Sequence, residues 1–220
     1  MKPEHRAKTL FSVEEKISIA IIAIFHVIGF VLLTFTKGGL YFLALDLVPL
    51  NIIFTVLVMM KQQKSWNMGL IIFGFTILLL GYVVEVIGVN TGLIFGQYTY
   101  GEILGIKFFG TPPLIGLNWF LLVYCAGCTV EILKSRLIVK VLISTCMLVF
   151  FDFLMEPVAV KLNFWTWNGG TIPTQNYIGW FATAFLFSFI FQITNWPKQN
   201  RLAAVVFAIQ LIFFLLQNIF

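Results

Sequence analysis

Long apolar runs separated by short polar segments dominate this chain. Seven runs are long enough for a membrane-spanning helix, at about 17–35, 40–60, 68–88, 113–133, 137–157, 178–195 and 202–219. Because these runs use most of the 220 residues, one polytopic membrane domain is predicted over 17–219, after a cytoplasmic segment over 1–16. The pattern therefore predicts an all-α integral membrane protein, a bundle of about seven transmembrane helices with no separate soluble domain.

The composition supports a membrane protein, and the charge pattern predicts its orientation. Residues are 60% hydrophobic and only 10% charged, whereas soluble domains average roughly 25% charged. The net charge of +5 comes from Lys and Arg dispersed over short loops, so no nucleic-acid partner is indicated. The N-terminal segment and every second loop carry most of these cations, while the opposite loops hold only Lys37, Lys107 and Lys161. The positive-inside rule then predicts a cytoplasmic N-terminus, and we expect a bacterial inner membrane.

Two acids one helical turn apart interrupt the fifth apolar run. Asp152 and Glu156 are four residues apart, which places them on one helix face. Carboxylates in hydrocarbon cost about 2.5 to 3.5 kcal/mol each, so a use for them is expected. A structural alternative is that Pro157 ends the helix and leaves Glu156 at its rim, in contact with interfacial water. We favour a functional pair.

Two further acids are predicted at the same membrane level. Glu85 lies about one turn below the outer surface, and Asp46, a secondary candidate, lies near the outer end of the second run, where Pro49 predicts a kink. Acids gathered at one level suggest a shared polar pocket. We expect Glu85 and Asp152 to approach each other across a contact between the third and fifth helices.

The two outer loops above these acids are long and rich in aromatic residues, Gly and Asn. Tyr and Trp at this depth are typical of an interfacial belt, which is the simplest explanation. Their mixture with Asn, Gln and Gly also suits a lid over the acids. Candidate substrate-binding residues in these loops and the adjoining helix ends are Tyr98, Tyr100, Asn118, Trp119, Trp165, Trp167, Asn176 and Trp180.

These residue types indicate acid–base chemistry on a lipid-soluble substrate. A carboxyl group in a low-dielectric site can stay neutral and donate a proton, while a charged partner acts as base. Indole and phenol faces stabilise a nearby cation. Asp152, the deepest acid, is the first candidate for the proton donor, and Glu156 and Glu85 are candidates for orienting water and accepting its proton. Tyr98, Trp165 and Trp167 would close the site against bulk solvent.

The chain resembles the membrane carotenoid biosynthesis proteins that include carotenoid 1,2-hydratases. The resemblance is carried by four motifs in the same order, at 88–100, 152–159, 164–167 and 176–180. The resemblance covers roughly residues 80–182. It implies a cofactor-independent hydro-lyase, with no metal, that hydrates the terminal 1,2 double bond of an acyclic carotenoid end group to a tertiary alcohol. It also implies an acyclic carotenoid and the lipid bilayer as partners, with other carotenoid biosynthesis enzymes expected nearby.

Two other functions stay open on the residues alone. A lycopene-type carotenoid cyclase uses the same cation chemistry. A proton or ion transporter also places acids in helices, although the two halves of the chain show no matching pair of Gly- or Pro-broken helices. Product mass separates the enzymes, because hydration adds one water and cyclisation adds nothing.

Overall fold

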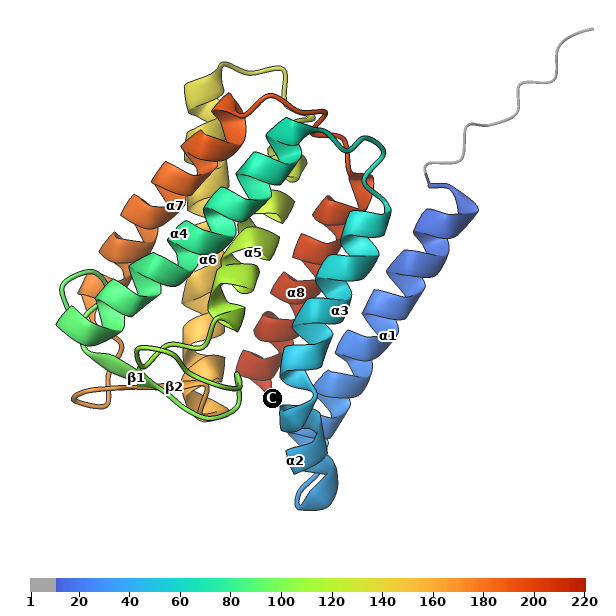
Figure 1. Cartoon of the computed structure of the whole chain (residues 1–220). Helices are drawn as coiled ribbons and strands as arrows, with labels where there is room; N and C mark the ends of the chain where they lie inside the picture. The colour runs from blue at the N-terminus through green and yellow to red at the C-terminus, as the bar shows by residue number, and fades with distance from the viewer. Residues whose placement is uncertain (1–10) are drawn as a thin grey trace, which may run out of the picture.

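The computed structural model describes residues 11–220, which form eight helices and a two-stranded sheet (Figure 1). Helix α1 spans Val13–Phe35, α2 Gly39–Asp46, α3 Val48–Lys61 and α4 Met68–Thr91. Helix α5 spans Leu114–Val130, α6 Leu137–Lys161, α7 Thr174–Ile193 and α8 Arg201–Ile219. The strands are β1, Tyr98–Tyr100, and β2, Trp165–Trp167.

Length and composition confirm the predicted helical membrane bundle. Within residues 11–220, α1, α4, α6, α7 and α8 are each long and apolar enough to span a membrane. The pair α2 and α3, bent by 44° at Leu47, makes a sixth candidate span, which agrees with the kink expected near Pro49. The remaining apolar helix, α5, has 17 residues and is shorter than the others. The predicted count of seven is therefore approximate.

Helix α5 occupies the centre of the bundle. Residues 119–128 are all buried, and α5 contacts α3, α4, α6, α7 and α8. A helix that is apolar on every face is stable only when it is covered on every face. The surrounding helices instead point Leu, Ile and Phe side chains outward, such as Leu57, Phe75 and Phe153, as expected for a surface in contact with lipid.

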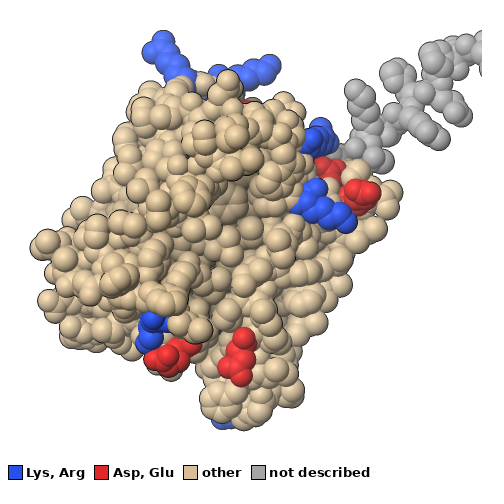
Figure 2. Space-filling view, viewed as in Figure 1, with Lys and Arg blue, Asp and Glu red and all other residues tan. Residues whose placement is uncertain are grey.

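The ends of the bundle differ in charge and in structure. Helix α1 begins at the upper end in Figure 1, whereas α8 finishes at the lower end, beside α2 and the strands. Figure 2 shows Lys and Arg mainly toward the upper end and a middle almost free of charge. A cytoplasmic N-terminus stays a prediction, and most of the segment predicted over 1–16, including Lys2, Arg6 and Lys8, lies outside the described residues.

The structural alternative for Pro157 is wrong. Helix α6 continues through this proline to Lys161, so Glu156 lies five residues inside the helix and is buried. A proline removes one backbone donor, and a membrane helix packed against neighbours tolerates that loss. Both acids of α6 are therefore part of the interior.

Candidate active site

A small antiparallel sheet joins the two long connections at the lower end of the bundle. Tyr98 pairs with Trp167, and Tyr100 pairs with Trp165. Side chains alternate along a strand, so these four aromatic residues are buried on one face. Thr99 and Thr166 point away from it, with their hydroxyl oxygens 3.1 Å apart. The aromatic lid expected from the sequence is thus a paired sheet, defined here as the aromatic sheet.

The first carboxyl group below this sheet is that of Glu85 on α4. It accepts hydrogen bonds from the hydroxyl groups of Tyr98, at 2.5 Å, and Tyr100, at 2.8 Å, on Oε2. The indole Nε1 of Trp119 donates to Oε1 at 2.8 Å. Burial and the adjacent carboxylate raise the pKa of both tyrosines above the usual range, so their hydroxyls stay protonated and donate.

The second and third carboxyl groups lie on α6 and share one amide. Asn176 Nδ2 lies 2.9 Å from Asp152 Oδ2 and 3.3 Å from Glu156 Oε1. Trp167 and Trp165 donate their indole N–H groups to Glu156 Oε2, at 2.8 and 3.1 Å. The other oxygen of Asp152, Oδ1, is buried and has no partner within residues 11–220.

The number of donors distinguishes the three carboxyl groups. Glu85 and Glu156 each receive three N–H or O–H donors, which favours the charged carboxylate. Asp152 receives one donor and is 0% exposed. An oxygen without a donor in a low-dielectric site favours the neutral acid. The surroundings thus suit Asp152 to carry a proton.

A small cavity of about 20 Å³ connects two of these acids. Glu85 and Glu156 line it together with all four residues of the aromatic sheet, Asn176 and Trp180. This volume matches the space that one water molecule needs, and the wall supplies several polar partners. Asp152 does not line the cavity, but it is hydrogen-bonded to Asn176, which does.

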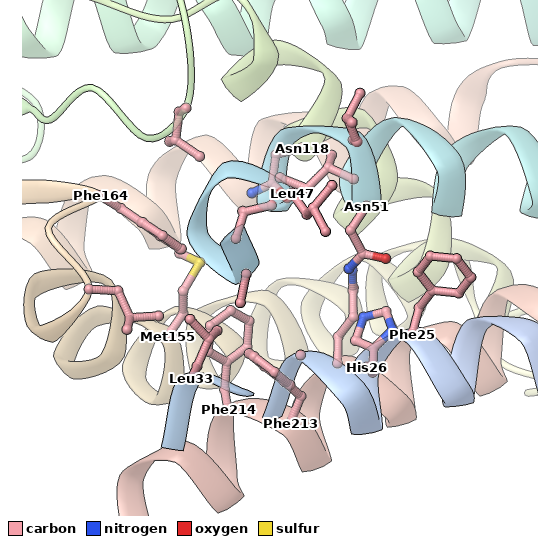
Figure 3. Close-up of a pocket in the computed structure, with 18 of the residues that line it drawn as sticks. Phe25, His26, Leu33, Leu47, Asn51, Asn118, Met155, Phe164, Phe213 and Phe214 are labelled. Atoms are coloured by element: carbon pink, nitrogen blue, oxygen red, sulfur yellow. The ribbon is translucent and has the colours of Figure 1, made fainter. Parts of the chain in front are cut away.

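A much larger cavity of about 400 Å³ lies beside the small one (Figure 3). Its walls come from α1, α2, α3, α5, α6 and α8 and are mostly aliphatic and aromatic. Ile115, Met155 and Trp165 line both cavities. Trp165 therefore lies between the apolar chamber and the carboxyl groups, since it lines the chamber and its indole N–H donates a hydrogen bond to Glu156.

Most sequence-predicted site residues meet here. Trp180 stacks on Trp119 with ring centroids 4.2 Å apart, which holds the Trp119 donor toward Glu85. Asn118 lies elsewhere: it lines the large apolar cavity. Asp46 does not join the other acids, because it lies at the exposed end of α2.

The predicted approach of Glu85 to Asp152 is indirect. Helices α4 and α6 share no extensive contact, and α5 and α7 each contact both of them. Glu85 instead lines the small cavity together with Glu156, and Asp152 is linked to that cavity through Asn176. Two long connections had to fold together to bring these groups near one another, which the helix positions alone do not indicate.

The large cavity has three polar residues that are not among the sequence-predicted site residues. His26, Asn51 and Gln210 line it in addition to Asn118. Each is a single polar residue in an apolar helix, so the signal was weak. Among residues 11–220, no group of three or more His, Cys, Asp or Glu side chains is arranged to hold a metal ion.

Fold and site together define an integral membrane protein with a water-sized polar cavity next to an apolar chamber. Comparison with known proteins gives the family: residues 45–220 match the model of the carotenoid biosynthesis proteins, and the chain belongs to that family. It is similar to the bisanhydrobacterioruberin hydratase of Haloarcula japonica, with 29% identity over 219 aligned residues that cover 87% of this chain and 70% of the relative. No solved structure matches it. The family resemblance inferred from the four motifs is confirmed.

Proposed function

We propose that this protein is a hydro-lyase that adds water to the terminal 1,2 double bond of an acyclic carotenoid end group and forms a tertiary alcohol, without a cofactor. The observation that carries the proposal is the water-sized cavity between Glu85 and Glu156, next to an apolar chamber. Water and a hydrocarbon chain can meet there in a site shielded from bulk solvent. Similarity to a relative named as a carotenoid hydratase supports the same reaction type.

Asp152 and Glu156 act as one acid unit in this proposal. Two carboxyl groups that share the Asn176 amide repel each other when both are charged, so the pair retains one proton. Asp152 holds that proton in the resting protein, because its Oδ1 has no donor. Glu156 forms the part of the unit that lines the small cavity.

The reaction begins when the acid unit protonates the terminal alkene. The new C–H bond forms at the less substituted carbon, and the positive charge develops on the tertiary carbon. Tyr98 and Trp167 present aromatic rings beside the cavity and stabilise this cation. The Glu85 carboxylate, which also lines the cavity, adds electrostatic stabilisation.

Water in the small cavity then attacks the tertiary cation. Its oxygen forms the new C–O bond, and Glu85 accepts the proton that it loses. Return of this proton to the acid unit restores the starting state, so the net change is one water added to one alkene. Tyr98, Tyr100 and Trp119 hold Glu85 in position for this step.

Analysis of pigments after expression in a lycopene-producing bacterium tests the proposal. We expect carotenoids whose mass has increased by one water for each reacted end. A product of unchanged mass but altered chromatographic mobility would indicate cyclisation instead. Absence of any hydrated carotenoid, despite normal insertion and a panel of acyclic carotenoids, would refute hydration.

The cell location and partners belong to the same proposal. We expect the protein in a bacterial inner membrane with a cytoplasmic N-terminus, among other carotenoid biosynthesis enzymes. The acids would then lie toward the outer leaflet, since the aromatic sheet is at the end opposite the start of α1 (Figure 1).

A further inference from the structure

The large cavity has a buried wall and an exposed wall. On the side of α5 and α6, next to the small cavity, the lining residues Ile115, Phe151 and Met155 are at most 6% exposed. On the side of α1 and α3, Ile28 and Leu50 line the same cavity but are 51% and 59% exposed. A side chain that lines a cavity and is also half exposed lies at an opening. The cavity therefore opens between α1 and α3.

Two contacts join α1 to α3 on one side of this opening. Gln62, which follows α3, donates from Nε2 to Ser18 Oγ at 2.9 Å. The rings of Phe25 and Phe54 lie 5.0 Å apart between centroids. Both contacts are nearer the start of α1 than Ile28 is, and α1 otherwise packs mainly on α8. The opening thus lies toward the end of the bundle that holds the aromatic sheet (Figure 1).

The opening lies at the depth of the lipid acyl chains. We define it by Ile28, Leu47 and Leu50, which all line the cavity, and name it the lateral mouth. Leu50 lies midway along the broken span Gly39–Lys61. Ile28 lies about 10 Å inside the end of α1, at about 1.5 Å per residue, within a hydrocarbon core about 30 Å thick. Among residues 11–220, no Asp, Glu, Lys or Arg lines the cavity, so the mouth suits a hydrocarbon chain and not a charged headgroup.

We propose that the substrate enters the large cavity from the bilayer through the lateral mouth, and that part of its chain stays in the mouth during the reaction. This inference rests on the proposed function of the acids. A cavity of about 400 Å³ is at the small end for ligand pockets, which enclose drug-sized molecules. The polyene chain of a carotenoid is longer than such molecules, so only its reacting end fits inside. The rest of the chain extends through the mouth into lipid.

The buried wall leads from the lateral mouth to the acids. A chain that enters between α1 and α3 crosses the large cavity to reach Met155 and Trp165, which line both cavities. Ile28 and Leu50 lie at the other side of the cavity and contact the part of the chain that does not react. They position the substrate and take no part in proton transfer.

Reversible cross-linking across the lateral mouth tests this entrance. Ile28→Cys and Leu50→Cys together place one thiol on each side of it. These helices run in opposite directions, and the pair lies about one turn beyond the ring contact that joins them (Figure 1). A bis-methanethiosulfonate reagent connects the thiols, and a reductant releases them. The exposed Cys146 is replaced by Ser, whereas Cys125 and Cys128 are buried and are kept.

The order of cross-linking and loading gives two opposite expectations. The full chain in lipid nanodiscs is loaded with lycopene, and the polyene still bound after exchange into lycopene-free lipid is measured by absorbance. This measurement counts substrate and any hydrated product alike, so it needs no turnover. Cross-linking before loading should lower the bound polyene to the background of empty nanodiscs. Cross-linking after loading should retain polyene that the reduced protein loses during exchange.

A second pair of cysteines is the matched control. Phe30→Cys and Phe220→Cys tie α1 to the end of α8, where the two rings lie 6.2 Å apart between centroids. Neither residue lines the large cavity, so loading should be the same with and without the reagent. Ile28→Trp and Leu50→Trp narrow the mouth without any reagent, and each should slow loading.

Equal loading of the cross-linked and reduced mouth pair would overturn the lateral mouth, and so would wild-type protein that retains phospholipid but no lycopene. Equal loss of loading in the control pair would also overturn it, because access would then depend on α1 as a whole. Loading that the mouth cross-link blocks, in a protein that hydrates no carotenoid, would support the mouth and contradict the proposed reaction alone. Hydration that continues unchanged in the cross-linked mouth pair would support the reaction and contradict the mouth.

Discussion

Replacement of Asp152 by Asn removes one transferable proton and little else. The side chain is wholly buried, with Oδ2 bonded to Asn176 and Oδ1 without a partner. Asparagine keeps the size and can keep the acceptor that Asn176 contacts. Its NH₂ group takes the position of an oxygen that has no donor to lose. The bundle should therefore insert and fold normally.

The expected loss follows from the proposed role of this proton. A positioned general acid contributes about 10²–10⁴-fold to rate, or about 3–5 kcal/mol of activation free energy. Glu156 cannot fully replace it, because three donors favour its charged form. Glu156 is hydrogen-bonded to the same Asn176 amide as Asp152, so it can still donate some protons in the variant. This residual activity sets the smallest loss of turnover that we expect. We expect turnover to fall at least about 100-fold.

The assay measures hydrated carotenoid per amount of membrane-inserted protein, by mass spectrometry of extracted pigments. Asp46→Asn is the matched control, since Asp46 is an exposed acid at the end of α2, away from the aromatic sheet. It should retain wild-type turnover. An Asp152→Asn variant that inserts normally and hydrates at the wild-type rate would exclude Asp152 as proton donor. Loss confined to Glu85→Gln would transfer the acid role to α4.

Three further changes probe the surroundings and the topology. Trp167→Phe removes the indole N–H that donates to Glu156 at 2.8 Å. A buried hydrogen bond to a charged group is worth about 1.5–3 kcal/mol, so turnover should fall about tenfold or more in the same pigment assay. Gly81→Ala places a methyl group 2.7 Å from Trp119 Cβ, so the Trp119 ring must shift. We expect lower activity and a changed tryptophan emission spectrum. An unchanged spectrum with full activity would contradict the close packing. A reporter fused after Phe220 should be active only outside the cytoplasm, and a cytoplasmic signal would reverse the assigned orientation.

The helices were predictable because hydropathy alone dictates them. A run such as 137–157 is mostly apolar over a length that crosses a bilayer, and the lipid forces its backbone into internal hydrogen bonds. Its end was less predictable. Pro157 is a common stop signal in water, but α6 continues four residues beyond it. Packing by neighbouring helices changes the cost of proline in a way that the local sequence does not encode.

The carboxyl groups could be predicted from the sequence, because an ionisable group in a membrane helix costs free energy. Their hydrogen-bond partners could not be predicted. Asp152 and Glu85 attract attention because ionisable groups in apolar runs are expensive. Which donors they receive depends on the pairing of segments 67 residues apart, such as Thr99 with Thr166. The alternation Tyr-Thr-Tyr and Trp-Thr-Trp was the available signal for that sheet. Three residues in each strand are too few to predict a pairing without the helices that bring them together.

Glu156 is buried by the aromatic sheet and not by its depth in the membrane. Counted along α6, Glu156 lies only five residues from the end of the helix, where water would normally reach a carboxylate. In the structure, Trp165 and Trp167 cover it from the side of the aromatic sheet, and only 2% of the residue is exposed. The aromatic sheet therefore buries this carboxyl group near the end of its helix. In the proposed reaction, a lipid-soluble substrate would reach the acids from the large cavity past Met155 and Trp165, which line both cavities, and Trp165 would also shield Glu156 from bulk water. A site that admits hydrocarbon and excludes bulk water would let the tertiary cation of the proposed reaction react with a single bound water molecule.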